Sequence, residues 1–183
     1  MRDYPYINKN GKKRPQSKEW ADIRAEIMCL KTELNLTDKS FRVLTPYDDY
    51  KGIEEQIYQT FCKIENGKNR PVCLWQNLAQ GTYSMEIKDA FENYLLHLIQ
   101  PNESVWFGVT GTFNERSKIW FYEGKIEAII KLLNEICFFD ECYFVSKKYD
   151  WLICITHHDT LIATGNYMLK KLKTIKDTEK NKG

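Results

Sequence analysis

Residues 142–165, CYFVSKKYDWLICITHHDTLIATG, decide the fold. Two apolar segments, 141–146 and 151–156, flank the charged turn Lys147-Lys148-Tyr149-Asp150, and this arrangement predicts a β-hairpin. A third apolar segment, 161–164, follows a His-His-Asp cluster and predicts one more strand. The run is therefore the centre of a sheet.

A similar strand-forming composition is found upstream of this run. Residues 104–110 and 118–122 are rich in aromatic and β-branched side chains and predict a second antiparallel hairpin. Helical spacing of apolar residues follows Gly124, and again over 166–175. The order over 101–176 is thus ββαββ(β)α. It predicts an α+β fold with an antiparallel sheet of about four to six strands and helices packed on one face.

The first half of the chain is predicted to be mostly helical. Apolar residues at helical spacing indicate helices beginning at Ser17, around residues 53–64, and from Ser84 or Met85 to Ile99, with a short strand at 41–44. Residues 1–16 read as a flexible basic arm, 17–176 as a single domain whose part 17–100 is mostly helical, and 177–183 as a flexible tail.

Charge is distributed unevenly along the 183 residues. Both ends are basic, whereas residues 19–169 hold 15 basic and 22 acidic side chains, a net charge of −7. No apolar run approaches the length of a membrane span, and the first residues lack the apolar core of a secretory signal. The six cysteines contain no Cys-x-x-Cys pair and are predicted to be core thiols in a cytoplasmic protein.

An acidic stretch interleaved with tyrosine is the candidate partner-binding patch. Carboxylates at the start of a helix are stabilised by its dipole, so a capped and solvated first turn also explains them. Aromatic side chains beside charge are typical of the residues that dominate protein–protein affinity. The predicted contact residues are Asp48, Asp49, Tyr50, Glu54 and Glu55.

His157, His158 and Asp159 form the candidate metal or acid–base site. Imidazole and carboxylate groups bind first-row metals, but adjacent histidines on a strand point to opposite faces, so both reach one ion only in a turn. No third ligand is identified. The chain has no nucleophile motif, no phosphate-binding glycine loop and no dinucleotide fingerprint, so no catalytic residue and no cofactor are assigned. A metal-dependent hydrolase centred on this cluster is the alternative function.

Nucleic-acid binding is the third function considered. Basic ends and aromatic strands favour it, since exposed aromatics can stack on bases. The acidic body opposes it, because phosphate would be repelled. Nucleic acid is therefore not the expected partner.

The C-terminal third resembles an uncharacterised bacterial family of small cytoplasmic proteins. The resemblance rests on the run 143–154, on His157-His158-Asp159 and Gly165, and on 119–124, and it covers about residues 104–170. Such families are similar in size and build to immunity proteins that neutralise toxins. The resemblance implies a non-enzymatic module whose acidic body docks on a basic toxin domain and blocks it.

Overall fold

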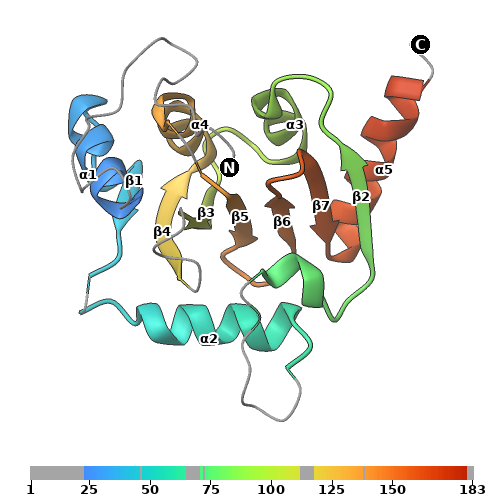
Figure 1. Cartoon of the computed structure of the whole chain (residues 1–183), viewed down its shortest axis with the longest axis horizontal. Coiled ribbons are helices and arrows are strands. Elements are labelled where there is room, and N and C mark those ends of the chain that lie inside the picture. Colours follow the sequence, from blue (N-terminus) through green and yellow to red (C-terminus); the bar gives the residue numbers. More distant parts are fainter. Residues whose placement is uncertain are drawn as a thin grey trace, which may run out of the picture.

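The computed structural model describes residues 23–45, 47–64, 71, 73–111, 118–137 and 139–180 (Figure 1). These residues form seven strands in one antiparallel sheet, ordered β1-β4-β3-β5-β6-β7-β2. The strands are β1 Phe41–Val43, β2 Thr82–Glu86, β3 Ser104–Thr110, β4 Ile119–Lys125, β5 Glu141–Ser146, β6 Leu152–Ile155 and β7 Thr160–Thr164. The helices are α1 Ile23–Glu33, α2 Tyr50–Phe61, α3 Phe91–Leu98, α4 Ile126–Glu135 and α5 Asn166–Lys180, with a 3-10 turn, η2, at Leu74–Asn77. The α+β prediction is confirmed, although the sheet has more strands than the four to six expected.

Helices cover both faces of the sheet, which corrects the prediction that they pack on one face. α1, α3, α4 and α5 lie on one side, and α2 lies on the other together with the 3-10 turn η2 (Figure 1). The core is split accordingly: Phe107 of β3 packs in the cluster under the four helices, and Trp106, its neighbour, packs in the cluster under α2 and η2. Successive residues of a strand point to opposite faces, so both faces of β3 are buried.

The central strands explain why two helical layers are needed. Every residue of β5 and β6 is buried, without the alternation of a strand that has one face in water. Tyr143 and Val145 face α2, whereas Cys142 and Phe144 face the larger helical layer. A single layer would leave one of these apolar rows in water, which costs about 25 cal/mol per Å² of apolar surface.

The helix predicted to begin at Ser84 or Met85 is wrong at its start, because residues 82–86 form strand β2 and α3 begins only at Phe91. Burial along β2 alternates, with Met85 buried between exposed Ser84 and Glu86. The strand pairs antiparallel with β7, from Thr82↔Thr164 to Glu86↔Thr160. The two-residue alternation of β2 is hard to recognise in the sequence. Ile87 and Phe91 follow it at helical spacing, so the predicted helix begins too early.

The N-terminal half is built into the sheet rather than set apart from it. β1 and β2 come from this half and occupy the two edges, so the strands of the C-terminal half lie between them. α5 continues to Lys180, past the predicted domain end at residue 176. Residues 1–16, Ser17 and residues 181–183 lie outside the described residues.

The six cysteines are all free thiols. Cys62, Cys142 and Cys154 are buried, as predicted for core thiols, and burial raises the pKa of Cys62 to about 11. Cys29 is exposed, which corrects the expectation for that position: it lies on α1 away from the buried stripe of Ile23, Ile27 and Leu30. None of the described helices has the length and apolar content to span a bilayer.

Gly165 joins β7 to α5 in a conformation that favours glycine, with φ of +94°. A Cβ atom there would lie 2.3 Å from the carbonyl oxygen of Asp150 and 2.8 Å from Cα of Trp151, both backbone atoms of the β5–β6 connection. The close approach locks the start of α5 against the central hairpin.

We expect Gly165→Ala to lower the free energy of unfolding by about 2 kcal/mol or more, since it combines backbone strain with a clash against main-chain atoms. Urea denaturation followed by circular dichroism measures this change. Gly81→Ala is the matched control, because its Cβ would meet nothing within 4 Å, and its effect should stay within about 0.5 kcal/mol. Equal effects at the two positions would contradict the role of Gly165.

Candidate functional site

β1 ends in a turn that Asp48 holds closed. Its carboxylate accepts hydrogen bonds from the backbone N–H of Thr45 at 2.7 Å and from the Thr45 hydroxyl at 2.8 Å. The backbone N–H of Asp48 donates to the carbonyl of Thr45 at 3.0 Å. Short polar side chains of this type compete with a strand ladder for backbone groups, so the chain leaves the sheet here.

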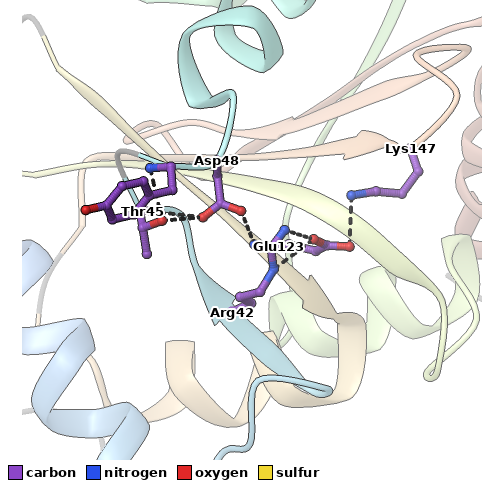
Figure 2. Close-up of polar contacts among 6 residues, drawn as sticks. Arg42, Thr45, Asp48, Glu123 and Lys147 are labelled. Carbon is purple, nitrogen blue, oxygen red and sulfur yellow. Dashed lines mark hydrogen bonds and ion pairs between the residues drawn. The ribbon is translucent and has the colours of Figure 1, made fainter.

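A row of charges ties this turn to the sheet (Figure 2). Arg42 of β1 binds Asp48 through Nη1, and its Nη2 lies 2.7 Å from Oε2 of Glu123 on β4. Lys147, in the turn between β5 and β6, completes the row with its Nζ 2.9 Å from Oε1 of Glu123. Exposed ion pairs contribute only about 0–1 kcal/mol each, so the main effect of the row is to fix geometry.

The pKa values of the acidic members reflect these contacts. The backbone hydrogen bond from Thr45, followed by the bond from Arg42, lowers the pKa of Asp48 to about 2. Partial burial raises the pKa of Glu123, but hydrogen bonds from Lys147 and Arg42 outweigh burial and leave it below its ordinary value. Both carboxylates are therefore charged at neutral pH.

Beside this turn lies a pocket of about 380 Å³, which we call the edge groove. α1 contributes Arg24, and α2 contributes Tyr50 and Glu54. The remaining lining residues come from the sheet edge and are Leu44, Thr45, Lys118, Ile119, Trp120 and Phe121.

The lining residues show how the edge groove is oriented. Ile119 and Phe121 pack with the cluster under α2, and Trp120 between them packs with the cluster under α1. Side chains that point to opposite faces of a strand line one pocket only if the pocket opens at the strand's edge. The edge groove therefore runs along the edge of β4, with α1 above the sheet and α2 below it.

Exposed apolar side chains gather around the edge groove. The guanidinium of Arg24 lies 4.7 Å from the ring of Trp120, and Lys118 Nζ lies 5.3 Å from it. Tyr47 is fully exposed in the turn that follows Thr45, and Tyr50 is 41% exposed at the start of α2. The other exposed large apolar side chains among the described residues are Met28, Leu96 and Tyr167.

The structure separates the residues of the predicted contact patch. Tyr50 and Glu54 line the edge groove, whereas Asp48 holds the turn. Asp49 is the N-cap of α2 and accepts a hydrogen bond from the backbone N–H of Gly52 at 3.0 Å. Glu55 accepts a 2.8 Å hydrogen bond from Gln59 along α2. Two of the five residues thus line the edge groove, and Asp48, Asp49 and Glu55 hydrogen-bond within the turn and α2.

His157 and His158 lie in the turn between β6 and β7, with ring centroids 4.0 Å apart. Nδ1 of His157 lies 3.3 Å from Oε1 of Glu141 on β5. Asp159 has a positive φ of 53°, and its backbone carbonyl accepts from Ile87 at 2.8 Å. Among the described residues, no group of three or more His, Cys, Asp or Glu could hold a metal ion.

Glu141 is the centre of a buried polar cluster beside these histidines. It is 2% exposed, and Trp75 Nε1 donates to it at 2.5 Å. The Tyr143 hydroxyl donates to its other oxygen and accepts from the backbone N–H of Leu74 at 3.2 Å. Burial raises the pKa of Tyr143 well above its ordinary range, so the phenol stays protonated as the donor. The cluster joins η2 to the sheet.

Sequence reasoning missed the residues of the edge groove outside α2. Lys118 and Trp120 are predicted only as members of the strand 118–122 and, for Trp120, of the run 119–124 that carries the resemblance, and Arg24 is not singled out. The available signal was Trp120 between two apolar neighbours, which indicates a strand with both faces covered. That pattern does not reveal that the edge of this strand is open.

We expect the Asp48 turn to weaken in acid. A carboxylate whose pKa is lowered in the folded state stabilises the fold above its ordinary pKa, and this contribution disappears as the pH falls through the folded value. The relevant window runs from the ordinary value of 3.8 down to about 2. Urea midpoints measured from pH 7 to pH 2 should fall less steeply in this window for Asp48→Asn than for the wild type, and parallel profiles would contradict the assignment.

We expect Tyr143→Phe to lower the free energy of unfolding by about 1–3 kcal/mol, because it removes the hydroxyl donor to one oxygen of the buried Glu141 carboxylate and leaves the Leu74 N–H without its acceptor. Chemical denaturation measures the loss. Tyr167→Phe is the control, since this ring is 62% exposed on α5. A Tyr143→Phe protein as stable as the control would show that the cluster is not structural.

The comparisons with known proteins identify a family. A model described as a family of unknown function (DUF6756) matches residues 19–176, and the chain therefore belongs to this family. No curated protein and no solved structure matches the chain.

Proposed function

We propose that this member of the DUF6756 family is a non-enzymatic protein-binding module that docks on a basic partner domain through the edge groove. The observation that carries the proposal is the grouping of an open pocket with exposed tyrosines, Tyr47 and Tyr50, at one end of the sheet. Aromatic residues around a pocket are the usual anchors of protein–protein affinity.

The exposed apolar side chains support this location. Monomeric proteins scatter such residues singly, whereas a group of them beside a pocket is typical of an interaction site. Tyr47 follows Thr45, which lines the edge groove, and Tyr50 lines it directly. Met28, 45% exposed, lies one helical turn after the lining residue Arg24 on α1. Of the five exposed large apolar side chains among the residues that the structure describes, three therefore line the edge groove or lie on segments that contribute to its lining.

Charge supports a basic partner. Residues 19–169 carry a net charge of −7, which would speed the approach of a cationic domain. The edge groove itself is lined by charges of both signs, Glu54 on the α2 side and Arg24 and Lys118 opposite, so the attraction for a basic partner comes from the acidic body as a whole. Charges of this kind affect the association rate and specificity, and the aromatic contacts slow dissociation.

An immunity-type role fits such a module. A small acidic domain that covers a basic toxin domain would block its active site by occupancy and would need no chemistry of its own. The proposed partner is accordingly a toxin domain, since the acidic body disfavours nucleic acid.

The test is capture of a basic protein from lysate of the source organism at physiological salt, followed by titration of the purified partner. We expect Tyr47→Ala/Tyr50→Ala to weaken binding roughly tenfold or more, because it removes two aromatic anchors. Both side chains are exposed, so the fold should be retained, and circular dichroism verifies this.

The matched control is Leu96→Ala/Tyr167→Ala, which also removes two exposed large apolar side chains but from α3 and α5. Binding by this control should equal that of the wild type. A partner that binds all three proteins equally would place the interaction elsewhere, and a preparation that retains no basic protein would overturn the proposed function.

A further inference from the structure

We infer that the edge groove receives one extended segment of the partner, which pairs with β4 as an added strand in line with β1. This inference rests on the proposed function and specifies its binding mode. Addition of a strand to a sheet edge combines main-chain hydrogen bonds for affinity with side-chain pockets for specificity.

The register of β1 leaves room for such a strand. β1 pairs with β4 from Phe41↔Gly124 to Val43↔Tyr122, and this pairing then stops within the described residues. β4 continues for three residues beyond that point, to Ile119, and on its other side it remains paired with β3 to the end. The Asp48 turn takes the chain away at this place and thereby exposes the edge.

Backbone directions show which groups face the added strand. The backbone N–H of Lys125 donates to Ser40 at 2.8 Å, so Lys125 points toward β1. Alternate residues of an antiparallel strand point to the same neighbour, so Phe121 and Ile119 also direct their N–H and C=O groups to the β1 side. Trp120 points to β3, where it pairs with Val109. Two residues of β4 thus present backbone groups to the edge groove.

Side chains on the two sides would select the sequence of the segment. Residues of an added strand alternate between the faces. Those facing α1 would meet Trp120 with Arg24 and Lys118, which favours aromatic or acidic residues. Those facing α2 would meet Tyr50 and Glu54, which favours basic residues with long apolar stems. A segment with this alternation from a basic partner satisfies both sides.

The opposite edge of the sheet is guarded and supplies a contrast. Lys176 of α5 donates to the backbone carbonyl of Ser84 in β2 at 3.3 Å. Lys173 and Lys176 also lie over the ring of Tyr83, at 5.4 and 5.1 Å. The bond from Lys176 occupies a backbone acceptor of β2 that a further strand at this edge would need. The edge groove is therefore the edge at which we place the segment.

The test uses a phage-displayed random decapeptide library selected on the wild-type protein and counter-selected on Tyr50→Ala/Glu54→Lys. The best peptide is then synthesised with a single N-methyl group at each position in turn. Methylation of amides that face β4 should weaken binding roughly tenfold, because each removes one hydrogen bond, whereas methylation of the intervening amides should have little effect. Affinities are measured by calorimetry.

Amide exchange by NMR gives an independent readout on the protein. The peptide should slow exchange at Ile119 and Phe121 and leave Trp120 unchanged, since Trp120 is already paired with β3. Leu96→Ala, exposed on α3, is the control variant and should bind the peptide like the wild type.

The added strand is overturned if the positions at which N-methylation weakens peptide binding do not alternate along the peptide. A library that yields no peptide dependent on Tyr50 and Glu54 also overturns it. A dimer in light scattering that the peptide dissociates would assign the edge groove to a second copy and also overturn it. These results leave the proposed function standing if the partner still requires Tyr47 and Tyr50. Conversely, the peptide could pair with β4 while the partner binds Tyr47→Ala/Tyr50→Ala as tightly as the wild type. That result would reject the proposed function and leave the added strand standing.

Discussion

Burial of both faces of β5 is the constraint on which the rest of the structure depends. Since Tyr143 and Val145 point to one side and Cys142 and Phe144 to the other, apolar layers are needed above and below the sheet. The chain supplies α1 to the first layer and α2 to the second, with β1 between them in sequence. It must therefore pass an edge of the sheet, and it does so at the turn held by Asp48.

The proposed binding site follows from this crossing. A turn that leaves the sheet early shortens β1, and a shortened β1 leaves the first three residues of β4, 119–121, beyond the end of its pairing. The same turn places Tyr47 in solvent and begins α2 at Tyr50. Arg42 and Glu123 contribute by holding the turn in place, so they act on the site through geometry without lining it.

Local patterns predicted most of the elements but not their layers. The two C-terminal hairpins and the helix after Gly124 were identified from period and turn chemistry, and the structure contains them. Burial on both sides was already visible in the unbroken apolar run of β6, Leu152–Ile155, but it was interpreted through the one-faced architecture that is common for antiparallel sheets. The sequence does not reveal β2, because this edge strand has only five residues and the helical spacing of the apolar residues that follow it is the stronger pattern.

The site was only partly predictable for a physical reason. Tyr50 and Glu54 belong to one helix and were found from local spacing, whereas Trp120 and Arg24 reach them only through the sheet and α1. Contacts between distant segments leave no periodic trace in one sequence. Likewise, the carboxylate that His157 contacts belongs to Glu141, 16 residues away along the chain.

The unequal edges of the sheet also bear on solubility. A sheet with two receptive edges can join copy after copy into a ribbon, since each addition exposes a new acceptor. Here the lysines of α5 close the β2 side. With a strand added at the edge groove as proposed, growth would end after that one pairing event, because the β2 edge offers no second acceptor.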